Sequence, residues 1–295
     1  MDYEFMKAME NTGIVPLRTP RRNAAGYFRF PVVGGSPYDW CGWYRENDDG
    51  SICYGDFSRD ISLTYFPPKE HSDSVDLDEY RVSVERQLEK DKTIQDVQRN
   101  AAALALDIFR SNSPALPTHH YLVAKKVGVH GIRQTMDGRL IIPLVNGDGR
   151  ISTLQFIFEN GSKRLLAGGC VQGCFHAIGD HKQNWPIVIV EGYATAASTF
   201  ENTGVMTVMA INAGNIPAVT GTMRDLHPDA RIIILADNDA LKGTNTGLKA
   251  ARKTCEMFPD VKYVLIPVPG MDANDYVNAG HDLIDLIRRE LDEKA

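Results

Sequence analysis

The chain has 295 residues, 43% of them hydrophobic and 24% charged, which is typical of a globular protein with room for two or three domains. No run of about 18 apolar residues occurs, and residues 1–11 lack an apolar signal region, so we expect a cytoplasmic protein that does not associate with membranes. Five scattered cysteines, an odd number, exclude a disulfide framework.

The net charge of −6 is distributed unevenly. Residues 118–185 carry 8 Lys/Arg and 4 Asp/Glu, whereas residues 186–295 carry 10 and 15. A basic segment beside an acidic one suits an enzyme that handles both phosphates and metal ions. A basic excess of four charges over 68 residues also arises by chance, so charge alone does not establish that function.

The first part of the chain predicts a small β-rich module followed by a helical linker. Residues 1–66 are rich in glycine, aromatic residues and turn signals, which favours short hairpins. Residues 67–117 begin as a polar linker, and apolar positions between residues 94 and 108 then recur at helical spacing. Thr93 and Asp96 form a plausible capping box, so we expect the helix to begin there.

The remainder predicts two different sheets. Within residues 118–185, apolar runs at 140–145 and 151–158 flank an Asp-Gly turn, which indicates an antiparallel meander in a mixed α+β subdomain. Within residues 186–295, four apolar runs alternate with helical patterns, which predicts a mainly parallel sheet with flanking helices, an α/β fold. These four runs span residues 187–190, 205–211, 232–235 and 263–266.

Carboxylates follow three of these runs. Glu191 follows the first; Asp237 and Asp239 follow the third; Asp272 and Asp275 come after the fourth. Because the carboxyl ends of parallel strands meet at one edge of the sheet, these groups are expected to converge. Each motif alone is more often a turn or a helix cap, but together they predict a site for Mg²⁺ or Mn²⁺, whose charge would offset their repulsion.

The order strand, Glu191-Gly192, helix, then strand ending in Asp237-x-Asp239 resembles the Toprim motif of primases, topoisomerases and related nucleases. The wider sequence is similar to the DNA primases of conjugative plasmids and phages, and the basic segment before the motif resembles their template-facing subdomain. This similarity rests on residues 121–122, 140–144, 149, 152–157, 161–166, 173, 191–196, 212–215, 236–239 and 274–276, and residues 40–57 resemble a small N-terminal module of such primases.

The resemblance implies a C-terminal Toprim catalytic domain over residues 186–295, preceded by a primase subdomain over residues 118–185. It implies synthesis of short RNA primers on single-stranded DNA from nucleoside triphosphates, by metal-dependent nucleotidyl transfer in plasmid or phage replication or transfer. Glu191, Asp237 and Asp239 would be catalytic and would hold the metal together with Asp275 and Asp272. The candidates for binding nucleic acid and nucleotide are Lys163, Arg164, Arg139, Arg150, Lys125, Lys126 and Arg133.

Two features depart from fuller members of this family. The sequence contains no Gly-x-x-x-x-Gly-Lys-Ser/Thr phosphate loop, so any replicative helicase would be a separate partner. Cys170, Cys174 and His176 offer three soft ligands without a fourth, and Cys41 and Cys53 alone do not rebuild a zinc ribbon. We therefore expect buried thiols rather than zinc.

Two alternatives remain open from the sequence. A Toprim-type nuclease would use the same carboxylates to cleave phosphodiesters, although the basic subdomain argues against it. The second alternative is a non-catalytic Toprim scaffold that only binds DNA, although the intact acidic residues argue against a loss of catalysis.

Overall fold

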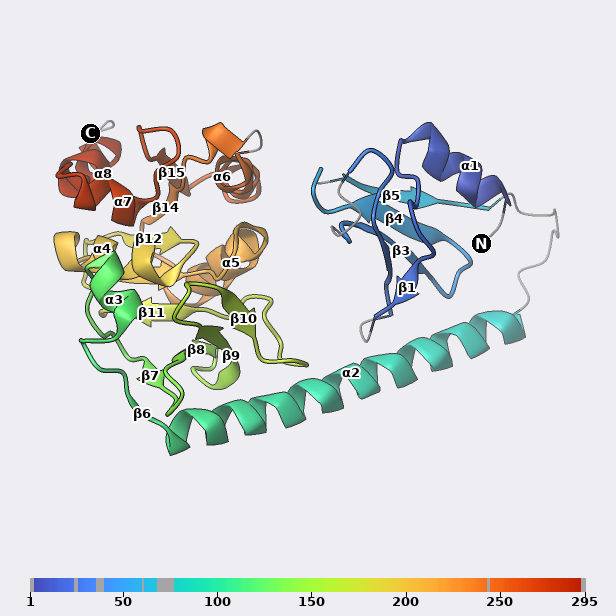
Figure 1. Ribbon diagram of the computed structural model, residues 1–295, viewed down its shortest axis with the longest axis horizontal. Coiled ribbons are helices and arrows are strands. Elements are labelled where there is room, and N and C mark those ends of the chain that lie inside the picture. The colour runs from blue at the N-terminus through green and yellow to red at the C-terminus, as the bar shows by residue number, and fades with distance from the viewer. Residues whose placement is uncertain are drawn as a thin grey trace. The chain divides into compact units, whose positions relative to one another are not determined.

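The computed structural model describes residues 3–23, 26–35, 40–59, 61–67, 77–242 and 245–292 (Figure 1). Two compact units make up the chain, residues 1–93 and residues 94–295. Within the described ranges, no helix combines the length and the apolar character needed to cross a bilayer.

The first unit is an antiparallel sheet with one helix packed on it. The strands pair in the order β1 (Arg21–Arg22), β2 (Phe28–Phe30), β3 (Gly42–Glu46), β4 (Ile52–Asp56) and β5 (Ile61–Tyr65). The predicted β-rich character is confirmed, but helix α1 (Tyr3–Asn11) was not predicted. It buries Phe5 and Met9 in one core with Phe30, Tyr44 and Tyr54. This core occupies one face of the sheet.

Helix α2 (Leu77–Ser111) runs across the boundary between the two units. It continues through Thr93, so the predicted helix start at that residue is wrong. Residues 85–92 are mostly strong helix formers, so the helix can begin well before the cap that was predicted at Thr93. Asp96 instead forms an exposed ion pair with Arg99 at 3.0 Å, one turn further along.

The second unit begins with another antiparallel sheet and one short helix, α3 (His120–Lys125). Its strands are β6 (Ser113–Pro114), β7 (Arg133–Gln134), β8 (Leu140–Val145), β9 (Ile151–Ile157) and β10 (Lys163–Leu165), and neighbours along the chain pair with one another. The predicted meander is confirmed by β8, β9 and β10. One face packs Ile141 and Leu154 against Ala105 of α2, and the other contributes Leu140 and Ile142 to the largest core.

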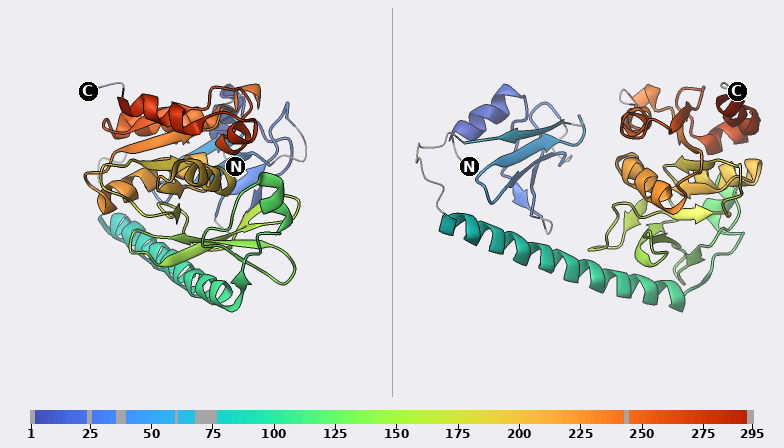
Figure 2. Two further views of the ribbon diagram at one scale, coloured as in Figure 1. Left: turned by 90° about the vertical axis from the view of Figure 1, so that its left-hand side faces the viewer. Right: turned by 180° about the vertical axis from the view of Figure 1, so that it is seen from behind.

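A third sheet completes this unit, and its predicted parallel character is confirmed (Figure 2). The order is β11 (His176–Ile178), β13 (Thr207–Met209), β12 (Ile187–Val190), β14 (Ile232–Ala236) and β15 (Lys262–Leu265). All neighbouring pairs are parallel except β11 with β13. Helices cover both faces, as predicted.

Side chains along each strand point alternately to the two faces of the sheet, and each face packs against a different set of helices. Val188 and Val190 enter a core with α4 (Tyr193–Thr203), α7 (Ala273–Asn278) and α8 (Leu283–Asp292), and with the antiparallel sheet. Ile187 and Ile189 enter a second core with α5 (Ile216–Leu226) and α6 (Thr246–Met257). Since the first core contains both sheets, the basic segment and the acidic segment are packed as one body.

Candidate active site

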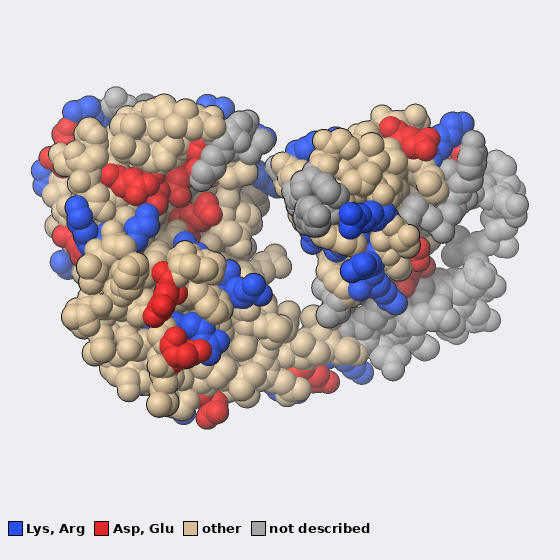
Figure 3. All heavy atoms as spheres, viewed as in Figure 1, with Lys and Arg blue, Asp and Glu red and all other residues tan. Residues whose placement is uncertain are grey.

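The carboxyl edge of the parallel sheet collects the predicted acidic residues. Glu191 follows β12 directly, and Asp237 follows β14. Asp272 lies beyond β15, at the start of α7. In Figure 3, acidic side chains gather on one face of the second unit, with lysine and arginine side chains beside them. We refer to Glu191, Asp237, Asp239 and Asp272 as the acidic cluster.

Asp237 is the most perturbed member of this cluster. Its Oδ1 atom is buried and has no hydrogen-bond partner among the described residues. Burial, together with the carboxylates of Asp272, Glu191 and Asp239, raises the pKa of Asp237 to about 8, and the Lys163 ammonium partly opposes this rise. A carboxylate that has a buried, unpartnered oxygen and lies among like charges is costly unless a cation is near.

The structure distinguishes Asp272 from Asp275. Asp272 caps helix α7 by accepting a hydrogen bond from the Asp275 backbone N–H at 2.8 Å, and its charge reaches Asp237. Asp275 lies at the margin, where its carboxylate is 3.4 Å from the Lys125 ammonium. The same ammonium is 4.0 Å from Asp272. Asp272 therefore belongs to the cluster, and Asp275 borders it.

A residue that the sequence analysis passed over, Asn238, holds the two aspartates in place. Its side-chain amide donates to the Ile266 carbonyl at 2.9 Å, and its Oδ1 accepts from Asn245 at 3.2 Å. Its backbone N–H donates to the Met271 carbonyl at 3.0 Å. Asn238 is buried between two acidic neighbours and ties β14 to the loop after β15. In the sequence, the signal for this role is a polar residue that lies between two candidate metal-binding carboxylates.

Removing this amide is expected to loosen the acidic cluster. Asn238→Ala should reduce the free energy of unfolding by about 1–3 kcal/mol, because it leaves the Ile266 carbonyl without its donor. It should also raise the divalent-cation concentration needed for half-maximal activity, measured well below the unfolding temperature. Asn202→Ala, which removes an exposed amide on α4, is the matched control and should alter neither quantity measurably.

Lys163 is the predicted basic residue that reaches the acidic cluster from the other sheet. A Cβ atom on Gly192 would lie 3.2 Å from its Nζ atom, at the start of α4. The residue is exposed to solvent overall, but loss of water around the ammonium lowers the pKa of Lys163, an effect that Glu191, Asp272 and Asp237 oppose. The charges of Lys163 and Lys125 thus both act on the carboxylates at this edge of the sheet.

Arg164 has a different orientation. Lys163 pairs with Ile157 across the sheet and Arg164 pairs with Phe156. Ile157 belongs to the largest core and Phe156 packs against the α2 side, so the two basic residues point to opposite faces. Adjacent residues of a strand cannot both reach one site by their side chains.

The other basic candidates are spread over the second unit. Arg133 donates to the carbonyl groups of Arg110 and Asn112 at the end of α2 and lies over the Phe109 ring. Arg139 forms an ion pair with Asp137 at 3.0 Å. Arg150 and Lys126 are exposed. The structure thus brings two of the seven candidates to the acidic cluster and uses two others to support the fold.

Comparison with known proteins fits this geometry. Residues 186–282 match the family model described as the Toprim domain. This segment is a Toprim domain. The chain is 32% identical over 198 residues to an Escherichia coli protein named DNA primase TraC, covering 64% of this chain and 18% of that protein. A second protein of that name and organism is 28% identical over 278 residues, covering 86% and 19%.

The chain therefore spans less than a fifth of the length of these relatives. Among solved structures, the primase fragment of the bacteriophage T7 primase-helicase protein aligns with a TM-score of 0.43 and 16% identity, over 61% of this chain and 82% of that one. The resemblance to Toprim-type DNA primases that the sequence indicated is confirmed by the family model and by these two relatives.

The donor set of the Toprim domain fits a hard divalent cation. Carboxylate oxygens are the ligands that Mg²⁺ and Mn²⁺ prefer, and the buried Oδ1 of Asp237 is available to one. Within the described residues, no three Asp, Glu, His or Cys side chains are yet close enough to share one ion. The Lys163 ammonium lies among these carboxylates and supplies positive charge there. A cation entering the cluster would therefore compete with Lys163.

The cysteine–histidine segment next to the Toprim domain is engaged differently. Both ring nitrogens of the buried His176 face backbone carbonyls, with Nδ1 at 3.2 Å from Pro143 and Nε2 at 2.8 Å from His130. Burial raises the pKa of Cys174, which favours its neutral thiol. Binding zinc here would require His176 to give up one of its contacts, so the absence of zinc stays our prediction.

Proposed function

We propose that this chain is the catalytic part of a DNA primase that synthesises short RNA primers on single-stranded DNA. The observation that supports this most is that two lysines of the basic subdomain, Lys163 and Lys125, meet the acidic cluster of the Toprim domain. Phosphate-binding and metal-binding charges at one sheet edge are what nucleotidyl transfer requires. The role would lie in plasmid or phage replication or transfer.

Asp237 and Asp239 would hold Mg²⁺ or Mn²⁺ directly, with Glu191 and Asp272 completing the site and Asp275 at its border. Bound there, a divalent cation would supply charge stabilisation for the reacting phosphate and the leaving pyrophosphate. Lys163, displaced from the carboxylates by that ion, would be free to contact the triphosphate. Lys125 is held by the ion pair with Asp275 and would keep its ammonium at the same edge.

The reaction would join two nucleotides without an existing primer. The 3′-oxygen of one nucleotide forms a bond to the α-phosphorus of a nucleoside triphosphate, while the bond from that phosphorus to the bridging oxygen of the β-phosphate breaks. Pyrophosphate leaves, and we assign the proton of the 3′-hydroxyl to Glu191. The exposed residues Lys126, Arg150 and Arg164 are available for template phosphates.

The first unit offers a second surface for the template. On the sheet face opposite α1, arginines lie over aromatic rings: Arg21 over Trp40 at 4.9 Å, Arg29 over Phe57 at 4.7 Å and Arg45 over Tyr27 at 6.0 Å. Phe57 is 58% exposed. Trp40 and Tyr27 are half-buried. Rings that reach solvent between guanidinium groups are suited to single-stranded DNA, because rings stack on bases and arginines contact phosphates.

Replacing two of these arginines tests this surface. Arg21→Ala combined with Arg45→Ala should weaken binding to a single-stranded oligonucleotide and reduce the slope of log affinity against log salt by about 1.4, since each lost phosphate contact removes about 0.7. Lys7→Ala on α1, an exposed cation on the opposite side of this sheet, is the control and should leave the slope unchanged. Equal slopes in all three proteins would remove this face from template binding.

The proposed function is tested by incubating the protein with circular single-stranded DNA, all four ribonucleoside triphosphates, and Mg²⁺ or Mn²⁺. Short labelled oligonucleotides from the wild type, and none from Asp237→Asn combined with Asp239→Asn, would support a primase. Shortened template without product would identify a Toprim-type nuclease instead. Bound DNA with neither product nor cleavage would favour a non-catalytic scaffold, and adding a separate replicative helicase would test whether a partner is needed.

A further inference from the structure

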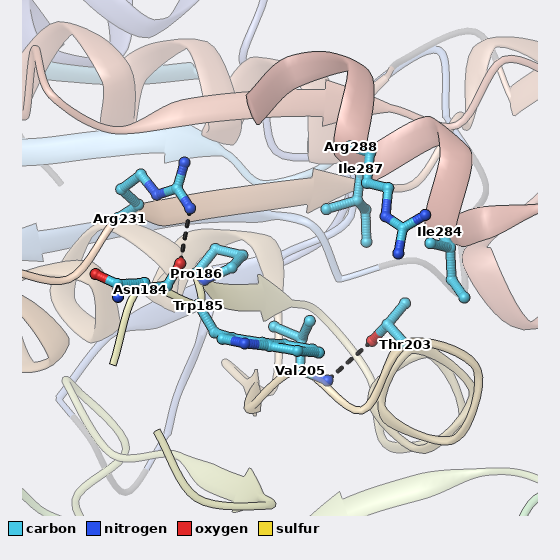
Figure 4. Close-up of a pocket in the computed structure, with 9 residues that line it drawn as sticks. All are labelled: Asn184, Trp185, Pro186, Thr203, Val205, Arg231, Ile284, Ile287 and Arg288. Carbon is cyan, nitrogen blue, oxygen red and sulfur yellow. Dashed lines mark hydrogen bonds between the residues drawn. The ribbon is translucent and has the colours of Figure 1, made fainter. Parts of the chain in front are cut away.

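A pocket lies at the opposite edge of the Toprim sheet from the acidic cluster, and its lining residues are drawn in Figure 4. Pro186, Val205 and Arg231 line it just before the starts of β12, β13 and β14, whereas Glu191 and Asp237 follow the ends of β12 and β14. Its volume is about 210 Å³. The lining residues are Asn184, Trp185, Pro186, Thr203, Val205, Arg231, Ile284, Ile287 and Arg288. The pocket is therefore separate from the proposed catalytic edge.

The interior of this pocket is mainly apolar and large enough for one side chain. Trp185 forms one wall and is 42% exposed, and Ile284 and Ile287 of α8 form the other. An apolar cavity of about 150 Å³ already accepts benzene, so this pocket has room for an aromatic or branched aliphatic side chain. A tryptophan left exposed beside an apolar hollow is typical of the anchor position of a protein–protein interface.

The loop that presents Trp185 is held in place. The Arg231 guanidinium donates to the Asn184 carbonyl at 2.8 Å, and the Trp185 backbone N–H donates to the Lys182 carbonyl at 3.0 Å. Asn184 adopts a left-handed conformation, with φ of 68°, which asparagine tolerates better than most residues. The exposure of Trp185 is thus built into the fold, and a ligand would bind without ordering this loop.

Positive charge surrounds the pocket. Arg231 and Arg288 line it, none of the described lining residues is acidic, and the Lys182 ammonium lies 5.3 Å from the centre of the Trp185 ring. An adjoining hollow that shares Trp185 and Arg231 adds a single acidic residue, Asp229. The pocket is therefore basic, although residues 186–295 as a whole are acidic, with 10 Lys/Arg and 15 Asp/Glu.

We propose that this pocket docks a short acidic peptide segment of a partner protein, with one aromatic or branched aliphatic side chain inserted beside Trp185. Carboxylates flanking that anchor would meet Arg231 and Arg288. A peptide fits better than a nucleic acid, because the aliphatic walls from α8 suit a side chain more than a flat base. In addition, the Lys182 ammonium already covers one face of the tryptophan ring.

The test selects ligands from a library of displayed random peptides on the full chain, and then measures the selected peptides by fluorescence anisotropy. We expect enriched sequences that combine aspartate or glutamate with one large apolar residue. Arg288→Glu and Trp185→Ser should each weaken their binding at least about tenfold, the loss expected for an interface anchor. Arg289→Glu, the neighbouring exposed arginine outside the pocket, should bind as the wild type does.

Primer synthesis should be unchanged in Arg288→Glu and Arg289→Glu, which keeps this proposal independent of the catalytic one. Enrichment of neutral or basic peptides, or equal binding by Arg288→Glu, would overturn it. So would displacement of the selected peptides by single-stranded DNA, which would make the pocket a nucleic-acid site. Dimerisation that Trp185→Ser abolishes would instead identify a second copy of this chain as the occupant.

Discussion

Asparagine in place of Asp237 is expected to reduce primer synthesis by about 10³-fold, the effect of losing several kcal/mol of charge stabilisation from the reacting phosphate. The amide keeps the shape of the side chain, so the fold should persist. What it loses is the negative charge that, with Asp239, would bind the divalent cation. Initial rates of dinucleotide formation under saturating template and triphosphate measure this loss.

The matched control is Asp225→Asn, an exposed carboxylate on α5 in the same domain. It changes the net charge by the same amount and should leave the rate unaltered. If Asp237→Asn primes as fast as Asp225→Asn, the acidic cluster does not carry the chemistry and the proposed mechanism is wrong.

The metal-free protein is expected to become less stable as the pH rises between about 4 and about 8. The pKa of Asp237 is about 8 in the folded protein, against an ordinary value of 3.8 for an aspartate side chain. Across that interval the folded state holds a proton that the unfolded state has released, so raising the pH favours unfolding. The loss should be on the order of a few kcal/mol by the top of this interval.

Urea denaturation in the presence of EDTA, repeated at a series of pH values, measures this slope. Asp237→Asn should flatten it and should be more stable than the wild type near pH 8, whereas Asp225→Asn should keep it. Mg²⁺ should restore stability mainly at high pH, where the cluster is ionised. Stability that rises with pH in the metal-free wild type would show that Asp237 is not a buried, repelled carboxylate.

Some features of this site follow from the order of strands and helices along the chain, whereas others depend on contacts that only the folded structure shows. Placing Glu191 and Asp237 at one edge needed only the alternation of apolar runs and helical patterns, because parallel strands all end on the same side. Distinguishing Asp272 from Asp275 needed the cap of α7, in which the two residues have different roles. Their spacing in the sequence does not reveal which one faces Asp237.

Contacts between distant segments were the harder part. Lys163 and Arg164 are equivalent as sequence, and only the register of β10 on β9 decides that they face opposite sides. Helix α1 was missed because it has only nine residues, too few for local signals to stabilise it, and it depends on the packing of Phe5 and Met9 on the sheet. The role of Asn238 depends on backbone groups some 28 residues away along the chain, which local patterns do not contain.

The most direct test of the central claim, that the acidic cluster is a divalent-cation site, is a titration of the purified protein with Mn²⁺ followed by electron paramagnetic resonance. We expect saturable binding by the wild type, loss of that binding in Asp237→Asn, and tighter binding in Lys163→Met, where the competing ammonium is gone. Binding by Asp237→Asn that equals that of the wild type would contradict the claim.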